Sequence, residues 1–185
     1  MEIYIIPAVL LLILLIGILT NNRIIAKKNT VSQAYGSIEI YLKKRFDLLP
    51  NLAAMLNRYM AHEKEILLQV TQLRSQVEKA EDPKENIEAS NQLTKLIGGL
   101  SVNMESYPEL KADRQFINLQ YELSDMEDQI SAARRAFNAA VVQYNNQIQM
   151  FPANLIASIR KDSQEPLLEI PKAEQKEVNL NQLLN

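Results

Sequence analysis

The sequence has no cysteine, no tryptophan, one histidine and only four glycines among its 185 residues. Without cysteine, the chain can form no disulfide and has no thiol nucleophile. A zinc site built from imidazole and thiolate ligands takes four of them, so a single chain with one histidine cannot supply it. The scarcity of glycine also argues against phosphate-cradling loops, and no Walker A or dinucleotide-binding motif is present.

The motifs of common hydrolases are missing as well. His62-Glu63 is followed by Lys64, Glu65 and Ile66, so the second histidine of the zinc-protease motif H-E-x-x-H is absent. No G-x-S-x-G nucleophile elbow occurs. We therefore expect no catalytic residue, no cofactor, no metal and no small-molecule substrate. An enzyme would need a site assembled from several subunits.

The charges of the chain are nearly balanced. The 20 Lys and Arg stand against 22 Asp and Glu, which gives a formal net charge of −2 at pH 7. Proteins that bind nucleic acid through its phosphates carry an excess of basic residues. We therefore expect no nucleic-acid partner.

One long apolar run, IYIIPAVLLLILLIGIL, occupies residues 3–19. Its 17 residues are at the short end for a bilayer-spanning helix. A cleaved signal peptide is the alternative, but no Lys or Arg precedes the run, and Thr20-Asn21-Asn22-Arg23 is a poor cleavage site. We expect residues 1–22 to be a retained, single-pass transmembrane anchor in contact with the lipid bilayer.

The basic residues beside this run predict its orientation. None precedes it, whereas Arg23, Lys27 and Lys28 follow it. Because basic residues stay on the cytoplasmic side of a membrane, we expect the N-terminus outside and the rest of the chain in the cytoplasm.

The longest regular pattern runs from Phe116 to Tyr144. Apolar or small residues recur there at alternating intervals of three and four residues: Phe116, Leu119, Leu123, Met126, Ile130, Ala133, Phe137, Ala140 and Tyr144. This spacing places them on one narrow face of a helix, which we call the seam. With its flanks the helix is expected from about Lys111 to Met150, roughly 60 Å long at 1.5 Å per residue. A helix of that length needs long partners, so the sequence predicts a helical bundle.

Other segments share the helical period and end at prolines or acidic residues. In chain order they are a helix at residues 32–47 that ends at Asp47-Leu-Leu-Pro50-Asn51, one at 52–77 that ends at Glu81-Asp82-Pro83, one at about 85–106 that turns at Tyr107-Pro108, and, after the central helix ends at Phe151-Pro152, a short apolar piece at 155–159.

These patterns predict an all-α fold. It consists of an N-terminal transmembrane helix (residues 1–22), an elongated antiparallel helical bundle (residues 23–160) and an extended C-terminal tail (residues 161–185). The tail contains Pro166, Pro171 and a run rich in Lys and Glu, a composition typical of extended chain.

Two groups of basic residues are candidate contacts to partners or to other copies of the chain. Lys43, Lys44 and Arg45 are consecutive, so they spread around the helix and form either a solvated face or a contact to lipid head groups or a partner. Arg134 and Arg135 lie beside Ala133 of the seam. We expect them to form salt bridges along the bundle rather than a phosphate site.

Three further residues are candidates because they break the local pattern. Glu63 is the one polar residue on the apolar face of the 52–77 helix. It is interpreted either as a residue at the bundle edge or paired with Arg or Lys, or as a buried polar contact that fixes register. Gly98 and Gly99 stand in mid-helix, where each costs on the order of 1 kcal/mol relative to Ala. This cost indicates a kink or a close approach by another helix.

Several short motifs follow one another between Arg23 and Ile159. They are Ile38-Glu-Ile-Tyr-Leu-Lys-Lys-Arg45, Asp47-Leu-Leu-Pro-Asn-Leu52, Tyr59-Met-Ala-His-Glu63, Tyr107-Pro-Glu-Leu-Lys-Ala112, Phe116-x-x-Leu-Gln120, Ala133-Arg-Arg135 with Asn138, Val141-x-x-Tyr-Asn145 and Phe151-Pro152. In this order the set resembles the LemA family of bacterial membrane-anchored helical proteins. The resemblance implies an inner-membrane span, a cytoplasm-facing bundle and no known catalytic activity. Family genes often lie near a membrane zinc metalloprotease of the HtpX type, and some relatives are linked to magnetosome membranes.

Two functions fit these expectations. In the first, the protein is a non-catalytic scaffold that self-assembles into a homo-oligomer on the membrane, because an anchor confines the subunits to a plane and raises their effective concentration. In the alternative, it is an adaptor that binds a membrane protease of the HtpX type, or an envelope stress-response partner, through its cytoplasmic bundle. Recovery of one stoichiometric membrane partner would favour the adaptor.

Overall fold

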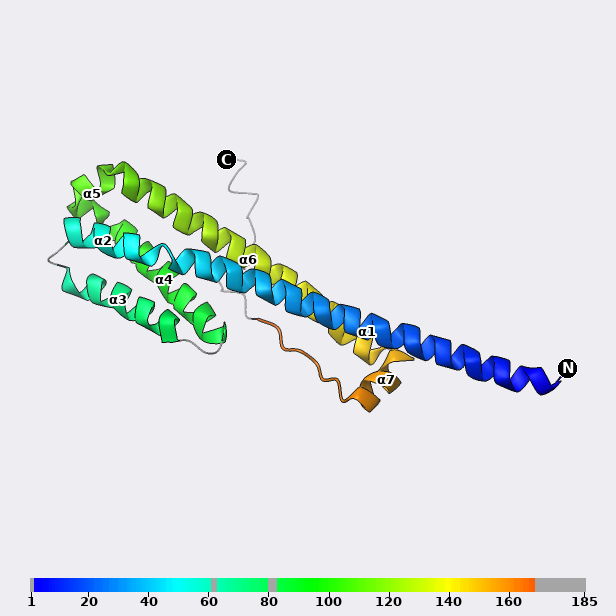
Figure 1. Ribbon diagram of the computed structural model, residues 1–185. Helices are drawn as coiled ribbons and strands as arrows, with labels where there is room; N and C mark the ends of the chain where they lie inside the picture. The colour runs from blue at the N-terminus through cyan, green and yellow to red at the C-terminus, as the bar shows by residue number, and fades with distance from the viewer. Residues whose placement is uncertain (1, 61–62, 80–82, 169–185) are drawn as a thin grey trace, which may run out of the picture. The chain divides into compact units, whose positions relative to one another are not determined.

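The computed structural model describes residues 2–60, 63–79 and 83–168 (Figure 1). Every regular element in these ranges is helical, so the all-α prediction is confirmed. In chain order the elements are α1 (Glu2–Phe46), α2 (Leu49–Tyr59), α3 (Lys64–Lys79), α4 (Pro83–Asn103), the 3-10 turn η1 (Met104–Ser106), α5 (Pro108–Ala112), α6 (Arg114–Gln149) and α7 (Ala153–Arg160). His62, the predicted helix end at Glu81-Asp82 and the tail beyond Leu168 lie outside the described residues.

The described helices form two compact units. One, which we call the four-helix unit, comprises residues 36–132. The other, the anchor unit, combines α1 up to Tyr35 with the chain from Ala133 onward. Each unit has its own buried apolar residues, and each is described by itself below.

Helix α1 carries the apolar run at its N-terminal end. It is long and apolar enough to cross a membrane, with a mean hydropathy of 2.4 over its most apolar window. Its large apolar side chains from Tyr4 to Leu19 are exposed on all sides of the helix. Burial begins at Thr20, which is 8% exposed, and Ile24 is fully buried. The packed part of the anchor unit therefore starts immediately after the apolar run, without a spacer.

In the anchor unit α1 and α6 pack antiparallel. The Lys27 Nζ donates a hydrogen bond to the Gln143 side chain at 2.8 Å, and the Tyr35 and Phe137 rings meet edge to face with centroids 5.6 Å apart. As the residue number rises along α1 from Lys27 to Tyr35, the residue number of the partner on α6 falls from Gln143 to Phe137. The core between them is apolar and includes Ile24, Val31, Val141, Tyr144 and Ile148.

In the four-helix unit the end of α1 and α2 run in the same direction, whereas α2, α3, α4 and α6 alternate in direction (Figure 1). The break after α1 falls at Asp47-Leu48, and α2 begins with Pro50 in its first turn, which is the predicted place. Along α6 the predicted seam is confirmed. Eight of its nine residues are buried, and Met126 is half-buried.

Two helices were predicted as continuous and are interrupted. The 52–77 helix is wrong as a single element, because Met60 leaves the helical region (φ −127°, ψ 37°) and α3 starts only at Lys64. The apolar residues of the predicted pattern nevertheless face one core, because α2 and α3 both turn them toward it. The central helix likewise starts at Arg114 rather than Lys111. Asp113 is extended and caps α6, where its Oδ1 accepts from the Gln115 amide at 2.7 Å.

Candidate functional site

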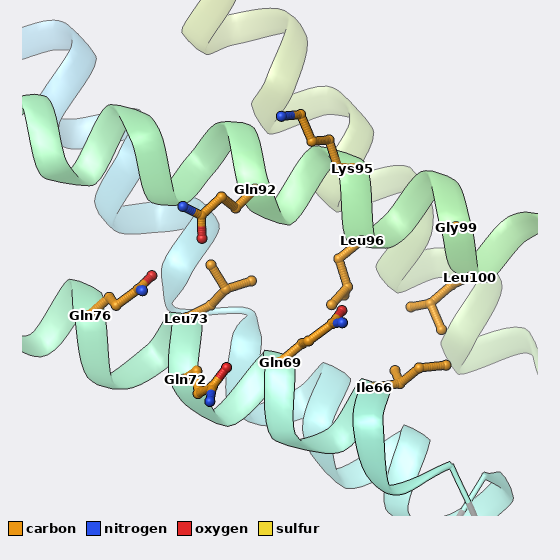
Figure 2. Close-up of a pocket in the computed structure, with 10 residues that line it drawn as sticks. All are labelled: Ile66, Gln69, Gln72, Leu73, Gln76, Gln92, Lys95, Leu96, Gly99 and Leu100. Carbon is orange, nitrogen blue, oxygen red and sulfur yellow. The ribbon is translucent and has the colours of Figure 1, made fainter.

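A groove lies between α3 and α4 in the four-helix unit (Figure 2). It encloses about 390 Å³. Leu73, Leu96 and Gln69 reach into the space between the two helices, as Figure 2 shows. The other lining residues are Ile66, Gln72, Gln76, Gln92, Lys95, Gly99 and Leu100. The groove therefore combines an apolar floor with four side-chain amides, each of which can donate and accept hydrogen bonds.

Gly99 lines this groove, and both Gly99 and its neighbour Gly98 are exposed. A Cβ atom added at either position would meet no atom within 4 Å among the described residues. The close helix approach expected from the sequence is therefore wrong within the described chain. Helix α4 is continuous from Pro83 to Asn103, and the expected kink stays a prediction. The buried face of α4 carries Leu93 and Leu100, which turns the glycines outward. They leave an open strip without side chains beside the groove.

The groove continues along the same two helices into a second hollow. This hollow shares Gln76 and Gln92 with the first. Its further lining residues include Lys79, Glu85 and Glu88. Together with Lys95 they place both signs of charge along the groove.

Arg45 lies inside the four-helix unit, although it belongs to a basic triplet. It is 1% exposed and donates to the Ser90 carbonyl at 3.1 Å, the Ser90 hydroxyl at 2.5 Å and the Thr94 hydroxyl at 3.0 Å. It also forms an ion pair with Glu127 of α6, and Glu127 accepts a hydrogen bond from Thr94 at 2.8 Å. A residue this buried cannot touch a partner, so its assignment to a surface contact is wrong.

Lys43 and Lys44 remain exposed. The Lys44 Nζ lies 5.6 Å from the centroid of the Tyr41 ring, a cation–π distance. In the other basic pair, too, one residue is buried and one is exposed. Arg134 is 1% exposed, whereas Arg135 is exposed. Because Arg134 is buried, it cannot contact an external partner. Its prediction as a partner contact is therefore wrong.

Two tyrosine–carboxylate hydrogen bonds join the α2–α3 turn to the α4–α6 turn. The Tyr107 hydroxyl donates to Glu63 at 2.6 Å, and the Tyr59 hydroxyl donates to Asp113 at 2.6 Å. Glu63 is half-buried, and this partner is a phenol rather than the expected Arg or Lys. The bond to Asp113 raises the pKa of Tyr59 and lowers that of Asp113. The bond to Glu63 likewise raises the pKa of Tyr107.

A short extended segment, residues 163–168, runs along α6 in the anchor unit, and we call it the strap (Figure 1). Asn145 exchanges two hydrogen bonds with the backbone of Glu165, and Asn138 does so with Leu168, all at 2.9 Å. Burial raises the pKa of Tyr144, and the nearby carboxylates of Asp162 and Glu165 raise it further. The sequence predicted extended chain here, but the contact of this segment with α6 was missed. The only signal was two asparagines seven residues apart on one helix.

No group of three or more His, Cys, Asp or Glu side chains that could hold a metal ion occurs in the part of the chain that the structure describes. The polar clusters around Arg45, Tyr59 and Tyr107 connect helices to one another. The open groove and its glycine strip are features of the four-helix unit that another molecule can reach.

Comparisons with known proteins agree on one family. A model of the LemA family matches residues 34–181, a range that includes the groove, the Arg45 cluster and the strap. Protein LemA of Metamycoplasma hominis is 30% identical to the chain over 156 residues, which cover 80% of this chain and 71% of that protein.

Proposed function

Because the chain belongs to the LemA family and carries a helix able to cross a membrane, we propose that it is a non-catalytic membrane-anchored scaffold. Its subunits associate with one another through the groove between α3 and α4. The membrane is the bacterial inner membrane, with the four-helix unit on the cytoplasmic side. The support for this side is the set of basic residues Arg23, Lys27 and Lys28 directly after the apolar run.

The single observation that carries the proposal is the glycine strip beside the groove. Two glycines in the middle of a helix cost on the order of 1 kcal/mol each relative to Ala, and no contact among the described residues offsets this cost. Glycine lets another backbone approach closely. A partner helix seated at Gly98 and Gly99 would supply that contact.

A second copy of the chain fits this surface by its chemistry. Side-chain amides both donate and accept, so the groove glutamines of one copy can pair with the same residues of another. Lys79 and Lys95 lie along the groove with Glu85 and Glu88. In a two-fold interface residue i of one copy contacts residue j of the other and the reverse, so two copies can pair Lys of one groove with Glu of the other.

Anchoring makes such a contact effective even when it is weak. Subunits held in one membrane plane have a higher effective concentration than subunits free in solution. The groove therefore need not bury a large area to assemble the protein on a membrane.

The test is the mass of the full-length protein, extracted in mild detergent and measured by light scattering over a range of concentrations. We expect a homo-oligomer that dissociates in the Gly98→Leu and Gly99→Leu variants, whose side chains block the strip. Ser124→Leu, at an exposed position in mid-α6, is the matched control and should leave the mass unchanged.

Other results point away from the scaffold. A monomer at every concentration contradicts the proposal. If that monomer is recovered with one membrane protein in stoichiometric amount, the adaptor function is favoured, with a membrane zinc metalloprotease as the first partner to examine.

A further inference from the structure

Helix α7 exposes two of its three large aliphatic residues. Its buried positions, Ala153 and Ala157, are small. Of its three large aliphatic residues, Leu155 is 57% and Ile159 83% exposed, and Ile156 is half-buried. Surface helices of globular proteins normally turn their large apolar residues to the core. The exposed apolar face of α7 therefore needs another explanation.

The turn between α6 and α7 carries two more exposed apolar residues. Met150 is 61% and Phe151 80% exposed. Together with Leu155 and Ile159 they form four large apolar side chains within ten residues of chain, which we call the α7 corner. Exposed apolar residues gathered in this way mark a contact with a partner or a membrane.

Two contacts place the α7 corner next to the end of the apolar run of α1. Arg160 donates to the Asn21 side chain at 2.6 Å, two residues beyond Leu19. Lys27 contacts Gln143, and because α1 and α6 are antiparallel with equal rise per residue, Gln149 lies at about the level of Asn21. Both ends of α7 are therefore close to this level.

The length of the apolar run brings this level into the membrane interface. Its 17 residues span about 25 Å as a helix, whereas a bilayer core is about 30 Å thick. A short span thins the bilayer or draws its flanking residues toward the hydrocarbon. The residues beside Asn21, and with them the α7 corner, are then at the depth of the lipid head groups.

The charges around the corner suit this position. Arg23, Arg160 and Lys161 are exposed at the same end of the anchor unit, where Arg160 also forms an ion pair with Asp162 at 2.8 Å. Basic side chains beside an apolar face are typical of helices that lie in a membrane interface, where they meet anionic head groups.

We propose that the α7 corner is a second membrane contact, in which α7 lies along the bilayer surface with Phe151, Leu155 and Ile159 among the lipid chains. The proposal rests on the membrane anchor of the proposed function. It concerns a lipid surface and does not depend on self-association.

The absence of tryptophan gives a direct test, because each substitution to Trp creates one reporter. Full-length Leu155→Trp and Ile159→Trp variants are reconstituted in vesicles of phosphatidylcholine and phosphatidylglycerol. Lipids brominated at shallow or deep chain positions then quench indoles by contact. We expect quenching of both variants, stronger with shallow than with deep bromines, and a blue shift of their emission.

Two matched variants separate the possible outcomes. Leu167→Trp on the strap starts from the same residue type with nearly the same exposure, 56%, and should stay unquenched because the strap runs away from the Asn21 level. Leu11→Trp, within the apolar run, should be quenched by deep bromines. Quenching of Leu11→Trp without quenching at Leu155 and Ile159 overturns the corner alone, as does equal quenching at Leu167. No quenching of Leu11→Trp overturns the anchor as well.

Discussion

Asn138 binds the backbone of Leu168 through both ends of its side-chain amide. Its Nδ2 donates to the Leu168 carbonyl, and its Oδ1 accepts from the Leu168 amide, each at 2.9 Å. Asn145 holds Glu165 in the same way. Seven residues of helix rise about 10.5 Å, and three residues of extended chain rise about 10 Å. The two spacings match, so α6 carries a ladder for the main chain of the strap.

This ladder predicts protected amides in the strap. The backbone amides of Glu165 and Leu168 should exchange their hydrogens slowly, although the strap belongs to no helix or sheet. Asn145→Ala should speed exchange at Glu165, and Asn138→Ala should do so at Leu168, because each variant removes both bonds. Hydrogen exchange followed by mass spectrometry measures this. Asn146→Ala, at an exposed neighbouring position, is the control, and equal exchange in all three variants would contradict the ladder.

The strap should stay bound to α6 when a side chain is shortened, but not when a backbone amide that donates to α6 is removed. Leu168→Ala keeps the amide that donates to Asn138, whereas Leu168→Pro removes it. We expect trypsin to cleave after Lys161 faster in Leu168→Pro than in Leu168→Ala. Pro166 already stands between the two bound residues, where neither asparagine needs an amide donor. If both variants are cleaved at the same rate, the strap is held by side-chain packing instead.

The Arg45 cluster should contribute strongly to stability. Removing one partner of a buried ion pair typically costs about 3 to 5 kcal/mol, and Arg45→Ala also leaves the Ser90 and Thr94 oxygens without their donor. Lys44→Ala removes an exposed charge on the same turn and should change the free energy of unfolding by less than about 0.5 kcal/mol. Urea unfolding of the full-length protein in mild detergent, followed by circular dichroism, compares the two. Equal midpoints would show that the cluster adds nothing.

The Tyr59–Asp113 bond should make stability depend on pH at both extremes. The raised pKa of Tyr59 contributes stability that is complete below the ordinary tyrosine value of about 10 and is lost as pH rises through the folded value. The lowered pKa of Asp113 contributes stability above the ordinary Asp value of about 3.9, which is lost as pH falls through the folded value.

The Tyr59→Phe variant tests this dependence. It should flatten both the alkaline and the acid decline of the melting temperature, while Asp113 still caps α6. Tyr121→Phe changes a tyrosine that is 72% exposed and should leave the profile unchanged. Parallel profiles for the wild type and Tyr59→Phe would contradict the assigned role.

Replacement of Gly98 or Gly99 by alanine should not destabilise the monomer. Gly98→Ala and Gly99→Ala meet open space and should each raise the free energy of unfolding of the monomer by about 1 kcal/mol. The reverse change at an exposed position of α6, Ala132→Gly, should lower it by a similar amount. Unfolding at concentrations too low for association measures these values. A loss of stability at Gly98 would reveal a contact that this position makes within the chain.

The parts of the fold that the sequence predicted are those governed by local rules. The seam of α6 repeats its three-four spacing over eight turns, and such a long period leaves one face to bury. The breaks near Pro50 and Pro152 follow from the missing proline amide. By contrast, the turn between Tyr59 and Lys64 contains no proline or glycine. The chain reverses there because α2 and α3 pack on one core. Packing of this kind depends on residues far apart in the chain, so local sequence patterns do not predict it.

The polar contacts were predicted least well, because they join residues far apart in the chain. The burial of Arg45 depends on Ser90, Thr94 and Glu127, none of which is near it in sequence. Glu63 stood out as the polar residue on an apolar face, but its tyrosine partner lies 44 residues away. Periodicity identifies such exceptions without supplying their partners.

The unbroken course of α1 has a mechanical consequence. No loop or hinge separates the apolar run from the part of α1 that packs against α6 and α7, so in the anchor unit any tilt of the run tilts these helices with it. A helix adapts to bilayer thickness largely by changing its tilt. We therefore expect the anchor unit to tilt as one rigid body. The angle between α7 and the bilayer surface should then change with the local thickness of the bilayer.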